Sequence, residues 1–382
     1  MPWKTIEPMN QRSEFVLRAI KTENFRELCR EYGISAKTGY KWRERFLQDG
    51  LKGMGEHSRR PKSSPQGLAE AVVCEMVKLK QQHRHWGPRK LRKLYERLHA
   101  EVPSESSFKR VLERAGLVQE RRVRRRQKSG RLPSGRKAQS PNQVWTVDFK
   151  GWWQAGGSGR MEPLTVRDEY SRYVLELRTL ANARTPTVRA CFERLFEAHG
   201  LPEAIRSDNG APFASERGVL GLSKLSAWWV ALGIDLERGR PGHPQDNGAH
   251  ERLHLDVEQE LRADQVVQQA EFDEWRRLFN QERPHEALGM KCPVELYRKS
   301  GRKYEGTPKD LEYQGMDSRR VAKWGSISLG RQRVYISVAL AGWSVGLKRC
   351  GAGESEIWFG RLLLGHWDPS TLSFQRTVQE AK

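Results

Sequence analysis

The sequence predicts a multidomain protein with all-α units at its N-terminus, an α/β domain in the middle and a small all-β domain at the C-terminus. Three observations support this fold class. The chain has 382 residues, whereas single domains commonly hold about 100–200. Helical spacing of apolar residues dominates up to residue 118, and strand-like and helix-like segments alternate from residue 141. Short strands separated by glycine turns take over after residue 305.

The positive charge of the chain is concentrated in its N-terminal third. The formal net charge is +21, and residues 1–140 hold 34 Lys or Arg against 15 Asp or Glu. Solubility alone would not require the charge to be gathered there, so we expect a polyanionic partner, with nucleic acid as the leading candidate. Solvated basic helices that only oppose aggregation are the alternative.

Several classes of protein are disfavoured by composition. No uninterrupted apolar stretch approaches the roughly 20 residues of a membrane helix, and the first residues lack the layout of a secretory signal. We therefore expect a cytoplasmic protein with no membrane partner. The five cysteines lie far apart without a C-x-x-C pair, which argues against both a disulfide framework and a thiolate zinc site.

Residues 1–60 are predicted to form a helix-turn-helix DNA-binding domain. Gly33 stands where the short turn needs a permissive backbone, and Trp42 is expected to pack inside. The second helix would then enter a major groove. Its candidate DNA contacts are Lys37, Thr38, Lys41 and Arg43. A helical bundle without DNA contacts is the alternative.

Residues 61–118 are predicted to form a second helical, helix-turn-helix-like DNA-binding domain. Pro88 suits a first helical turn, Ser104 or Ser106 an N-cap, and Gly116 a helix end. The candidate DNA contacts of this domain are Arg89 and Lys90.

Residues 119–140 are predicted to be a basic linker that is extended by self-repulsion. They hold nine basic residues against one Glu and almost nothing apolar. Such a segment can lie along phosphates without reading sequence, although a solvated spacer is the alternative. The candidate contacts are Arg121, Arg122, Arg124, Arg125 and Arg126.

Residues 141–304 read as an α/β domain. The segments "VWTVDFKGWW", "RMEPLTVRDEY" and "SRYVLELRTL" predict an antiparallel meander, because turns rather than helices connect them. A helix over 185–199, the strand "EAIRSD", a helix around "LSKLSAWWVALG", the strand "IDLER" and two closing helices follow. This order predicts a mixed sheet with helices on its faces.

Three acidic residues stand in unusual settings within this domain. Asp148 interrupts a strand whose alternation places it on the face opposite Trp145, and a lone buried charge there would be costly unless paired or coordinated. Asp208 follows a buried strand in "RSDNGAPF". Glu251 lies on a helix whose apolar stripe includes Leu253, about 200° away around the axis, so its carboxylate can face a site.

The blocks "WTVDF", "SDNGAPF" and "PQDNGAHERLH" resemble, in this order, the three catalytic blocks of DDE transposases with a retroviral-integrase-type core. The segment "FNQERPHEALGMKCPVELY" is similar to the block that follows them in bacterial insertion-sequence transposases. The resemblance covers residues 141–300, and the helix-turn-helix units upstream suit the same family.

The resemblance implies a ribonuclease-H-like fold in which Asp148, Asp208 and Glu251 are catalytic and bind two Mg²⁺ ions, with Mn²⁺ as a substitute. It also implies that water nicks the element end and that the freed 3′-hydroxyl attacks target DNA. Double-stranded DNA is the expected partner, in a homodimer or higher multimer at the bacterial nucleoid. Flanking residues that would position DNA or water are Asn209, Gln245, Asn247 and Arg252.

Other acidic residues near these blocks were weighed against the triad. Only Glu251, and neither Glu258 nor Glu260, sits in the N-G-x-x-E-R context. Asp168 is interpreted as a strand-end or turn residue and Asp246 as a loop or cap residue. The interval from Asp208 to Glu251, with 42 intervening residues, is longer than is common in the family.

Two other functions compete with a transposase. One is a DNA-binding regulator whose core has lost its chemistry, and the presence of all three carboxylates argues against it. The other is a structure-selective nuclease that cuts but does not join, although such an enzyme would not need sequence-specific N-terminal domains. Residues 305–382 are predicted to form a small β-barrel-like domain, and their role is left open.

Overall fold

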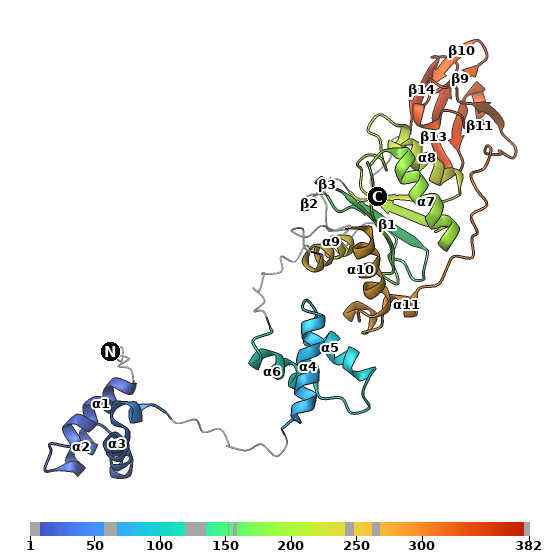
Figure 1. Cartoon of the computed structure of the whole chain (residues 1–382). Coiled ribbons are helices and arrows are strands. Elements are labelled where there is room, and N and C mark those ends of the chain that lie inside the picture. The colour runs from blue at the N-terminus through green and yellow to red at the C-terminus, as the bar shows by residue number, and fades with distance from the viewer. Residues whose placement is uncertain are drawn as a thin grey trace. The chain divides into compact units, whose positions relative to one another are not determined.

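The computed structural model describes residues 8–56, 67–118, 135–151, 153–155, 159–240, 248–261 and 268–377. It divides the chain into two compact units, Met1–Ala69 and Glu70–Lys382 (Figure 1). Over the described ranges, no helix is long and apolar enough to cross a membrane. The three predicted structural classes, all-α, α/β and all-β, are confirmed in the order expected, while the exact domain boundaries stay predictions.

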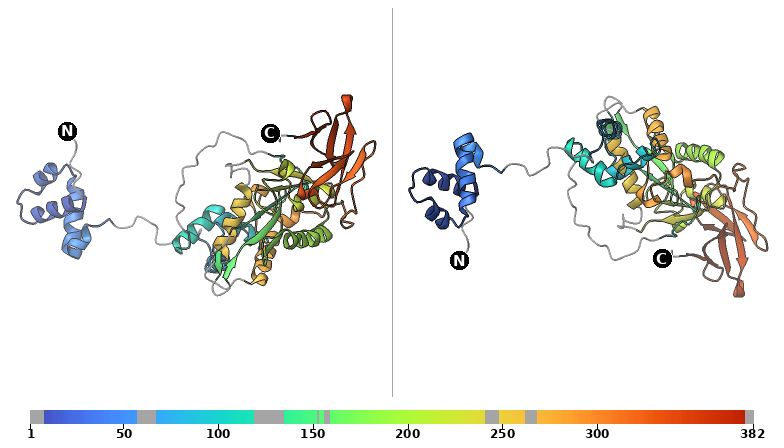
Figure 2. Two further views of the ribbon diagram at one scale, coloured as in Figure 1. Left: turned by 90° about the horizontal axis from the view of Figure 1, so that it is seen from above. Right: turned by 90° about the horizontal axis from the view of Figure 1, so that it is seen from below.

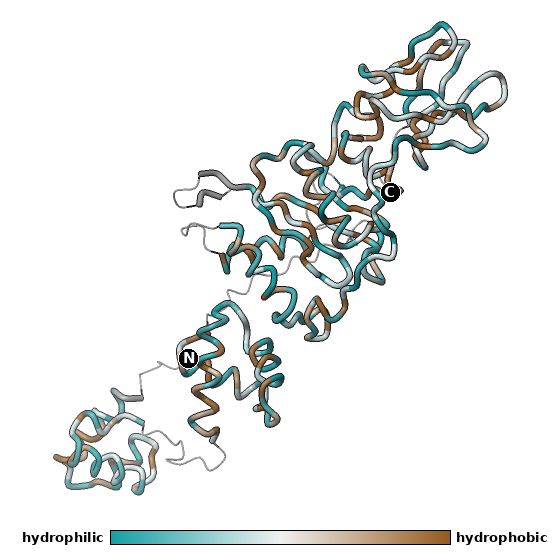
Figure 3. Tube along the Cα trace, turned by 45° about the vertical axis from the view of Figure 1, so that its right-hand side comes forward, coloured by the Kyte–Doolittle hydropathy of each residue, from teal (hydrophilic) through white to brown (hydrophobic). Residues whose placement is uncertain are grey.

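The first unit consists of three helices and a closing 3-10 turn: α1 (Pro8–Ala19), α2 (Phe25–Glu31), α3 (Ala36–Asp49) and η1 (Gly50–Met54). Ser35 caps α3, because its hydroxyl oxygen accepts a hydrogen bond from the Thr38 amide. Gly33 joins α2 to α3 with φ of +63°, as the sequence predicted. Trp42 is buried with Phe15, and the trace in Figure 3 alternates between hydrophilic and hydrophobic residues, as in amphipathic helices.

A second helical bundle begins the larger unit: α4 (Glu70–Gln82), α5 (Pro88–Glu96) and α6 (Glu105–Arg114). Pro88 occupies the first turn of α5, and Ser104 caps α6, both as predicted. The buried rings of Trp86 and Phe108 belong to its small apolar core. Trp86 is therefore a packing residue.

The centre of the larger unit is a five-stranded mixed sheet in the order β5-β4-β1-β6-β7. β1, β4 and β5 form the predicted antiparallel meander, and β6 and β7 extend it in parallel beside β1. A separate hairpin, β2 with β3, is inserted between the first two strands of the meander. The strands are β1 (Val144–Phe149), β2 (Trp153–Ala155), β3 (Gly159–Met161), β4 (Pro163–Asp168), β5 (Val174–Thr179), β6 (Ala204–Ser207) and β7 (Asp235–Arg238).

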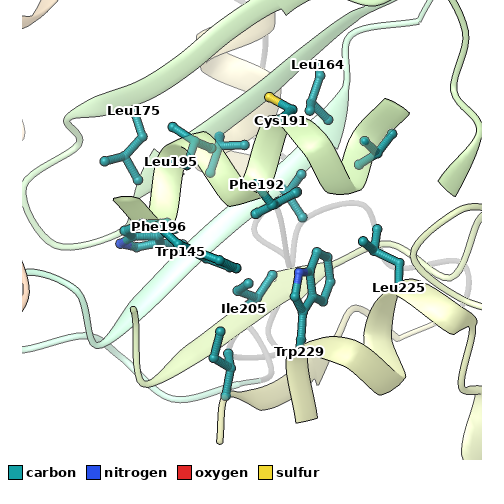
Figure 4. Close-up of a cluster of buried hydrophobic side chains, with 14 of the residues drawn as sticks. Trp145, Leu164, Leu175, Cys191, Phe192, Leu195, Phe196, Ile205, Leu225 and Trp229 are labelled. Carbon is teal, nitrogen blue, oxygen red and sulfur yellow. The ribbon is translucent and has the colours of Figure 1, made fainter. Parts of the chain in front are cut away.

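Helices cover both faces of this sheet (Figure 2). On one face, Trp145 and Val147 of β1 pack against aromatic and aliphatic residues of the first helix pair. Figure 4 shows Trp145 in this cluster with Phe192 and Trp229. On the other, Val174 and Leu177 of β5 pack against the second pair. The first pair is α7 (Thr185–His199) and α8 (Lys224–Ala231), and the second is α9 (Gly248–Glu260) and α10 (Gln269–Gln281). Short turns η2 (Val219–Gly221), η4 (Glu286–Leu288) and α11 (Pro293–Leu296) complete the domain.

The C-terminal region is a five-stranded antiparallel sheet, in the order β14-β13-β12-β11-β8, with a separate hairpin of β9 and β10. Its apolar core is continuous with one side of α8, because Val230 of that helix and Val219 and Leu222 before it are buried among the β-strand residues. The strands are β8 (Asp317–Arg320), β9 (Ser326–Leu329), β10 (Gln332–Tyr335), β11 (Ser344–Arg349), β12 (Ser355–Phe359), β13 (Leu362–Asp368) and β14 (Ser373–Arg376), with turns η5 (Val338–Leu340) and η6 (Gly351–Gly353). The segment between Asp208 and Glu251, which is longer than is common in the family, therefore supplies part of the contact with this sheet.

Candidate active site

Two of the three predicted carboxylates come from neighbouring parallel strands. β1 pairs with β6 in a register that sets Val144 opposite Ala204 and Thr146 opposite Arg206. Two residues further along each strand direction, this register brings Asp148 beside Asp208. Asp148 shares the side of the sheet with Thr146, which contacts His250 of the helix α9, so its carboxylate lies on that face. Asp208 directly follows the last residue of β6.

The loop that carries Asp208 is held by an aromatic contact to the strand that carries Asp148. Phe213 is fully buried, and its ring stacks on Phe149 at 5.5 Å and on Trp229 at 6.1 Å between centroids. At Gly210, an added Cβ would lie 2.9 Å from Oδ2 of Asp208.

The third carboxylate, Glu251, lies in the first turn of α9 and is exposed. The apolar stripe of that helix, including Leu253 and Val257, is buried against β5 and α10, as its spacing predicted. His250 is fully buried on the sheet side of the helix, where its ring nitrogens reach two threonines of the sheet. The helix is thus fixed on two sides, and Glu251 stays at the surface beside them.

The pKa of Asp148 is raised chiefly by the burial of its own carboxyl group. Burial is the main cause that raises this pKa from 3.8 to about 7, and the negative charges of Asp208 and Glu251 raise it further.

The fit of this region to a metal ion has two sides. Within the part of the chain that the structure describes, no three His, Cys, Asp or Glu side chains meet in an arrangement that could hold a metal ion. The chemistry of the donors nevertheless fits a hard divalent cation, which prefers carboxylate oxygens. The mutual repulsion that raises the pKa of Asp148 is also what a cation would relieve.

The other acidic residues have structural partners. Asp168 ends β4 fully buried and accepts hydrogen bonds from the amides of Asn142 and Ser171, which confirms its interpretation as a turn residue. Glu260 accepts from Trp275 and Arg283. Glu258 is paired with Lys150 at 3.3 Å. Neither glutamate competes with Glu251 for the position beside Asp148.

The flanking residues named from the sequence have diverse positions. Asn209 donates a hydrogen bond to the Gly239 carbonyl, which links the two loops after β6 and β7. Arg252 is paired with Asp256 one helical turn further along α9. Gln245 and Asn247, together with His243 and Asp246, lie outside the described residues.

The N-terminal candidates for DNA contact lie on α3. Lys37 and Lys41 are exposed, whereas Thr38 takes part in the cap of the helix, with its hydroxyl 2.9 Å from that of Ser35. The guanidinium of Arg43 lies over the ring of Tyr40 at 5.0 Å. The two lysines are the exposed cations of this set, and the ammonium group of Lys41 lies over the ring of Trp42 at 4.8 Å.

The candidates further along the chain are paired, half-buried or outside the described residues. Arg89 is paired with Glu105 at 2.6 Å. Lys90 is half-buried, and burial together with the nearby charge of Arg283 lowers its pKa to about 8. The linker arginines 121, 122, 124, 125 and 126 lie outside the described residues.

Sequence reasoning missed the histidine and threonine contacts beneath α9. Nε2 of His254 lies 2.8 Å from Oγ1 of Thr165. The sequence did not single out His250 or Thr165. The available signal was the spacing of His250 and His254, which puts both on one face of a helix.

Family models cover most of the chain. A helix-turn-helix domain matches residues 11–62 and a homeodomain-like domain matches residues 38–112. Integrase core domains match residues 138–244 and residues 232–293. The predicted helix-turn-helix units and integrase-type core are thereby confirmed.

Two relatives come from bacterial insertion elements. The insertion element IS476 uncharacterized 39.2 kDa protein of Xanthomonas euvesicatoria is 28% identical over 64% of this chain and 70% of its own length. The insertion element IS407 uncharacterized 31.7 kDa protein of Burkholderia multivorans is 26% identical over 62% of this chain and 84% of its own length. Among solved structures, a simian T-cell lymphotropic virus intasome chain, in complex with PP2A regulatory subunit B56 gamma, aligns with a TM-score of 0.38 and 15% identity. That alignment covers 80% of this chain and 99% of the other.

Proposed function

We propose that this chain, which belongs to the insertion-sequence DDE transposases with a retroviral-integrase-like core, cleaves DNA at the ends of its element and joins the freed 3′-hydroxyls to target DNA. The observation that supports the proposal is the parallel pairing of β1, which carries Asp148, with β6, which Asp208 follows directly. Glu251 completes the set, because its charge contributes to the raised pKa of Asp148.

The three carboxylates would hold two divalent ions, Mg²⁺ or Mn²⁺ in its place. Such ions, when bound, supply the positive charge that stabilises the oxygens attacking and leaving a phosphorus atom. In this proposal Asp148, Asp208 and Glu251 are ligands, and none of them is the base that removes a proton. The reaction therefore requires all three carboxyl groups to be ionised.

The reaction has two phosphoryl transfers. In the first, water attacks the phosphodiester at the element end, a new P–O bond forms, and the bond to the 3′-oxygen breaks to give a 3′-hydroxyl. In the second, that hydroxyl attacks a phosphodiester of the target, and one P–O bond again replaces another. Because each step exchanges one bond for an equivalent one, no nucleotide cofactor is needed.

The helix-turn-helix units would hold the element ends. Lys37 and Lys41 are exposed on α3, the helix expected to enter the major groove, and Arg43 lies on the same helix. Two ends must be joined in one reaction, so we expect a dimer or larger multimer on DNA, in the cytoplasm at the bacterial nucleoid. Each phosphate contact should contribute a salt-dependence slope of about 0.9.

DNA binding is tested by the salt dependence of affinity for labelled element ends. Lys41→Ala is expected to weaken binding and to lower the slope of log affinity against log salt by about 0.9. Lys21→Ala is the matched control, because Lys21 is exposed in the same unit but lies before α2. Equal effects of the two substitutions would contradict a groove contact by α3.

The chemistry is tested by strand transfer with a library of candidate element ends, a plasmid target and Mg²⁺. We expect joined products from the wild type and none from Asp208→Asn. Glu258→Gln is the matched control, since Glu258 is an exposed carboxylate on the helix of Glu251 and is expected to keep activity. Cleavage without joining would indicate a nuclease instead, and tight binding without chemistry a regulator.

A further inference from the structure

Helix α9 meets the sheet through a buried set of hydrogen bonds in addition to its apolar stripe. We call this set the polar seam, and it consists of Thr146, Thr165, His250 and His254. Oγ1 of Thr165 lies 2.5 Å from Nε2 of His250 and 2.8 Å from Nε2 of His254. Nδ1 of His250 lies 2.9 Å from Oγ1 of Thr146. The seam therefore ties one helix to two adjacent strands.

Counting donors gives the direction of the bonds that meet at Thr165. The Thr165 hydroxyl donates to the backbone carbonyl of Asp148 at 2.9 Å, so its oxygen must accept from both histidines. Each histidine then carries its proton on Nε2. The Thr146 hydroxyl has one proton and two acceptors within reach, Nδ1 of His250 at 2.9 Å and the Arg167 carbonyl oxygen at 3.4 Å.

The seam links the carriers of two candidate ligands through one atom. Thr165 is opposite Asp148 in the register of β4 with β1, and it bonds to the Asp148 backbone. The same oxygen is hydrogen-bonded to both His250 and His254. His250 directly precedes Glu251 in α9, and His254 follows it by less than one turn. A further contact secures the start of the helix, because buried Arg167 donates to the Ala249 carbonyl at 2.9 Å.

Apolar packing could hold this helix without any of these groups. Leu253 and Val257 already bury one side of α9, and buried polar residues add little net stability over well-packed apolar ones. Hydrogen bonds do, however, fix rotation and register, since each works over a narrow range of distance and angle. In an α-helix, one residue of slip would swing Glu251 by about 100° around the axis.

We propose that the polar seam positions Glu251 relative to Asp148, with Thr165 as the central positioning residue. The inference rests on the proposed function, because it assumes that Glu251 serves as a metal ligand together with Asp148. It assigns no chemical step to the four seam residues. It states that their hydrogen bonds set where the Glu251 carboxylate lies when an ion binds.

The test uses Fe²⁺ in place of Mg²⁺ in the full-length protein without DNA. With ascorbate and peroxide, bound iron produces hydroxyl radicals that cut the backbone of nearby segments, and the fragments report which segments lie next to the ion. The wild type is expected to be cut around Asp148, Asp208 and Glu251. Thr165→Val, which removes the hydroxyl at constant shape, is expected to keep the first two cuts and lose most of the third.

Two further variants separate positioning from folding. Thr165→Ser restores the hydroxyl and should restore the third cut. His254→Leu removes one arm of the seam at a half-buried position, and it serves if Thr165→Val does not fold. In both seam variants the Mn²⁺ dissociation constant, measured by electron paramagnetic resonance, should rise by about 10- to 100-fold, as for other residues that orient metal ligands. Serine should return it to the wild-type value.

The outcomes distinguish this inference from the proposed function. If the wild type shows no cuts near any of the three carboxylates, the metal assignment is wrong and the inference falls with it. If the wild type is cut at all three segments and the folded seam variants give the same pattern and the same Mn²⁺ affinity, the proposed function stands and the positioning role is overturned.

Discussion

Replacing Asp148 by Asn is expected to stabilise the protein at alkaline pH. Burial and the charges of Asp208 and Glu251 raise the pKa of Asp148 from 3.8 to about 7. Some carboxyl groups have a higher pKa in the folded protein than in the unfolded protein. Such a group contributes its full stabilisation of the folded state at pH values below the unfolded-state pKa. This contribution is lost as the pH rises through the folded-state pKa. Ionised Asp148 therefore costs stability above pH 7, whereas an amide of the same shape carries no charge and has no such cost.

The magnitude follows from the distance between the two pKa values. Ionised Asp148 costs about 1.4 kcal/mol of folding free energy for each pH unit by which the pH has risen from the unfolded-state pKa towards the folded-state pKa. This cost reaches roughly 4 kcal/mol at pH 8 and only about 1.5 kcal/mol at pH 5. Water reaches part of the Asp148 side chain, which screens the neighbouring charges. We therefore expect Asp148→Asn to raise the free energy of unfolding of the core by about 2–4 kcal/mol at pH 8.

The assay is urea unfolding in EDTA, which removes divalent ions, followed by tryptophan fluorescence at pH 5 and pH 8. Trp145, Trp228 and Trp229 are buried in the core and report on it. Glu258→Gln removes an exposed carboxylate and should change the unfolding free energy by less than about 0.5 kcal/mol at either pH. No gain for Asp148→Asn, or the same gain at both pH values, would refute the electrostatic reasoning.

Three other substitutions test the packing around the site. Phe213→Ala should cost about 3–5 kcal/mol and reduce strand transfer, because it removes the ring that holds the Asp208 loop; unchanged urea midpoints and activity would contradict this. Gly39→Ala puts a Cβ 2.6 Å from Sγ of Cys29, so it should destabilise the first unit by about 1–3 kcal/mol, seen as faster amide exchange there but not in the core. Val230→Asp buries a charge against the C-terminal sheet and should lower core stability by more than about 3 kcal/mol, whereas Trp324→Ala, at a side chain that is 77% exposed, should change it by less than about 0.5 kcal/mol. Equal effects of the two substitutions would refute the core that α8 shares with the C-terminal sheet.

Much of the fold was predictable because its signals are local. The helix expected over 185–199 has those bounds, since apolar spacing and a proline in its first turn are properties of a single segment. The meander was predicted from alternation and turns, and Asp168 from its place at a strand end. The hairpin of β2 and β3 was missed, because it is too short to show a period.

Other features depend on contacts that no local pattern reports. Helix α8 is apolar on both sides because it packs on the central sheet and on the C-terminal sheet at once. The sequence shows only that "LSAWWVAL" is apolar and does not indicate two partners. Lys90 looked like a free cation, but the fold half-buries it near Arg283, far along the chain.

The sequence by itself determined which residues carry the candidate chemistry. Asp148, Asp208 and Glu251 were identifiable from their neighbours in the chain, because a strand or helix position and its side-chain type are both written locally. Only the tertiary structure decided how they are held. The bond between Thr165 and His250 joins residues 85 positions apart, and such a pairing exists only after the sheet and the helix have packed together.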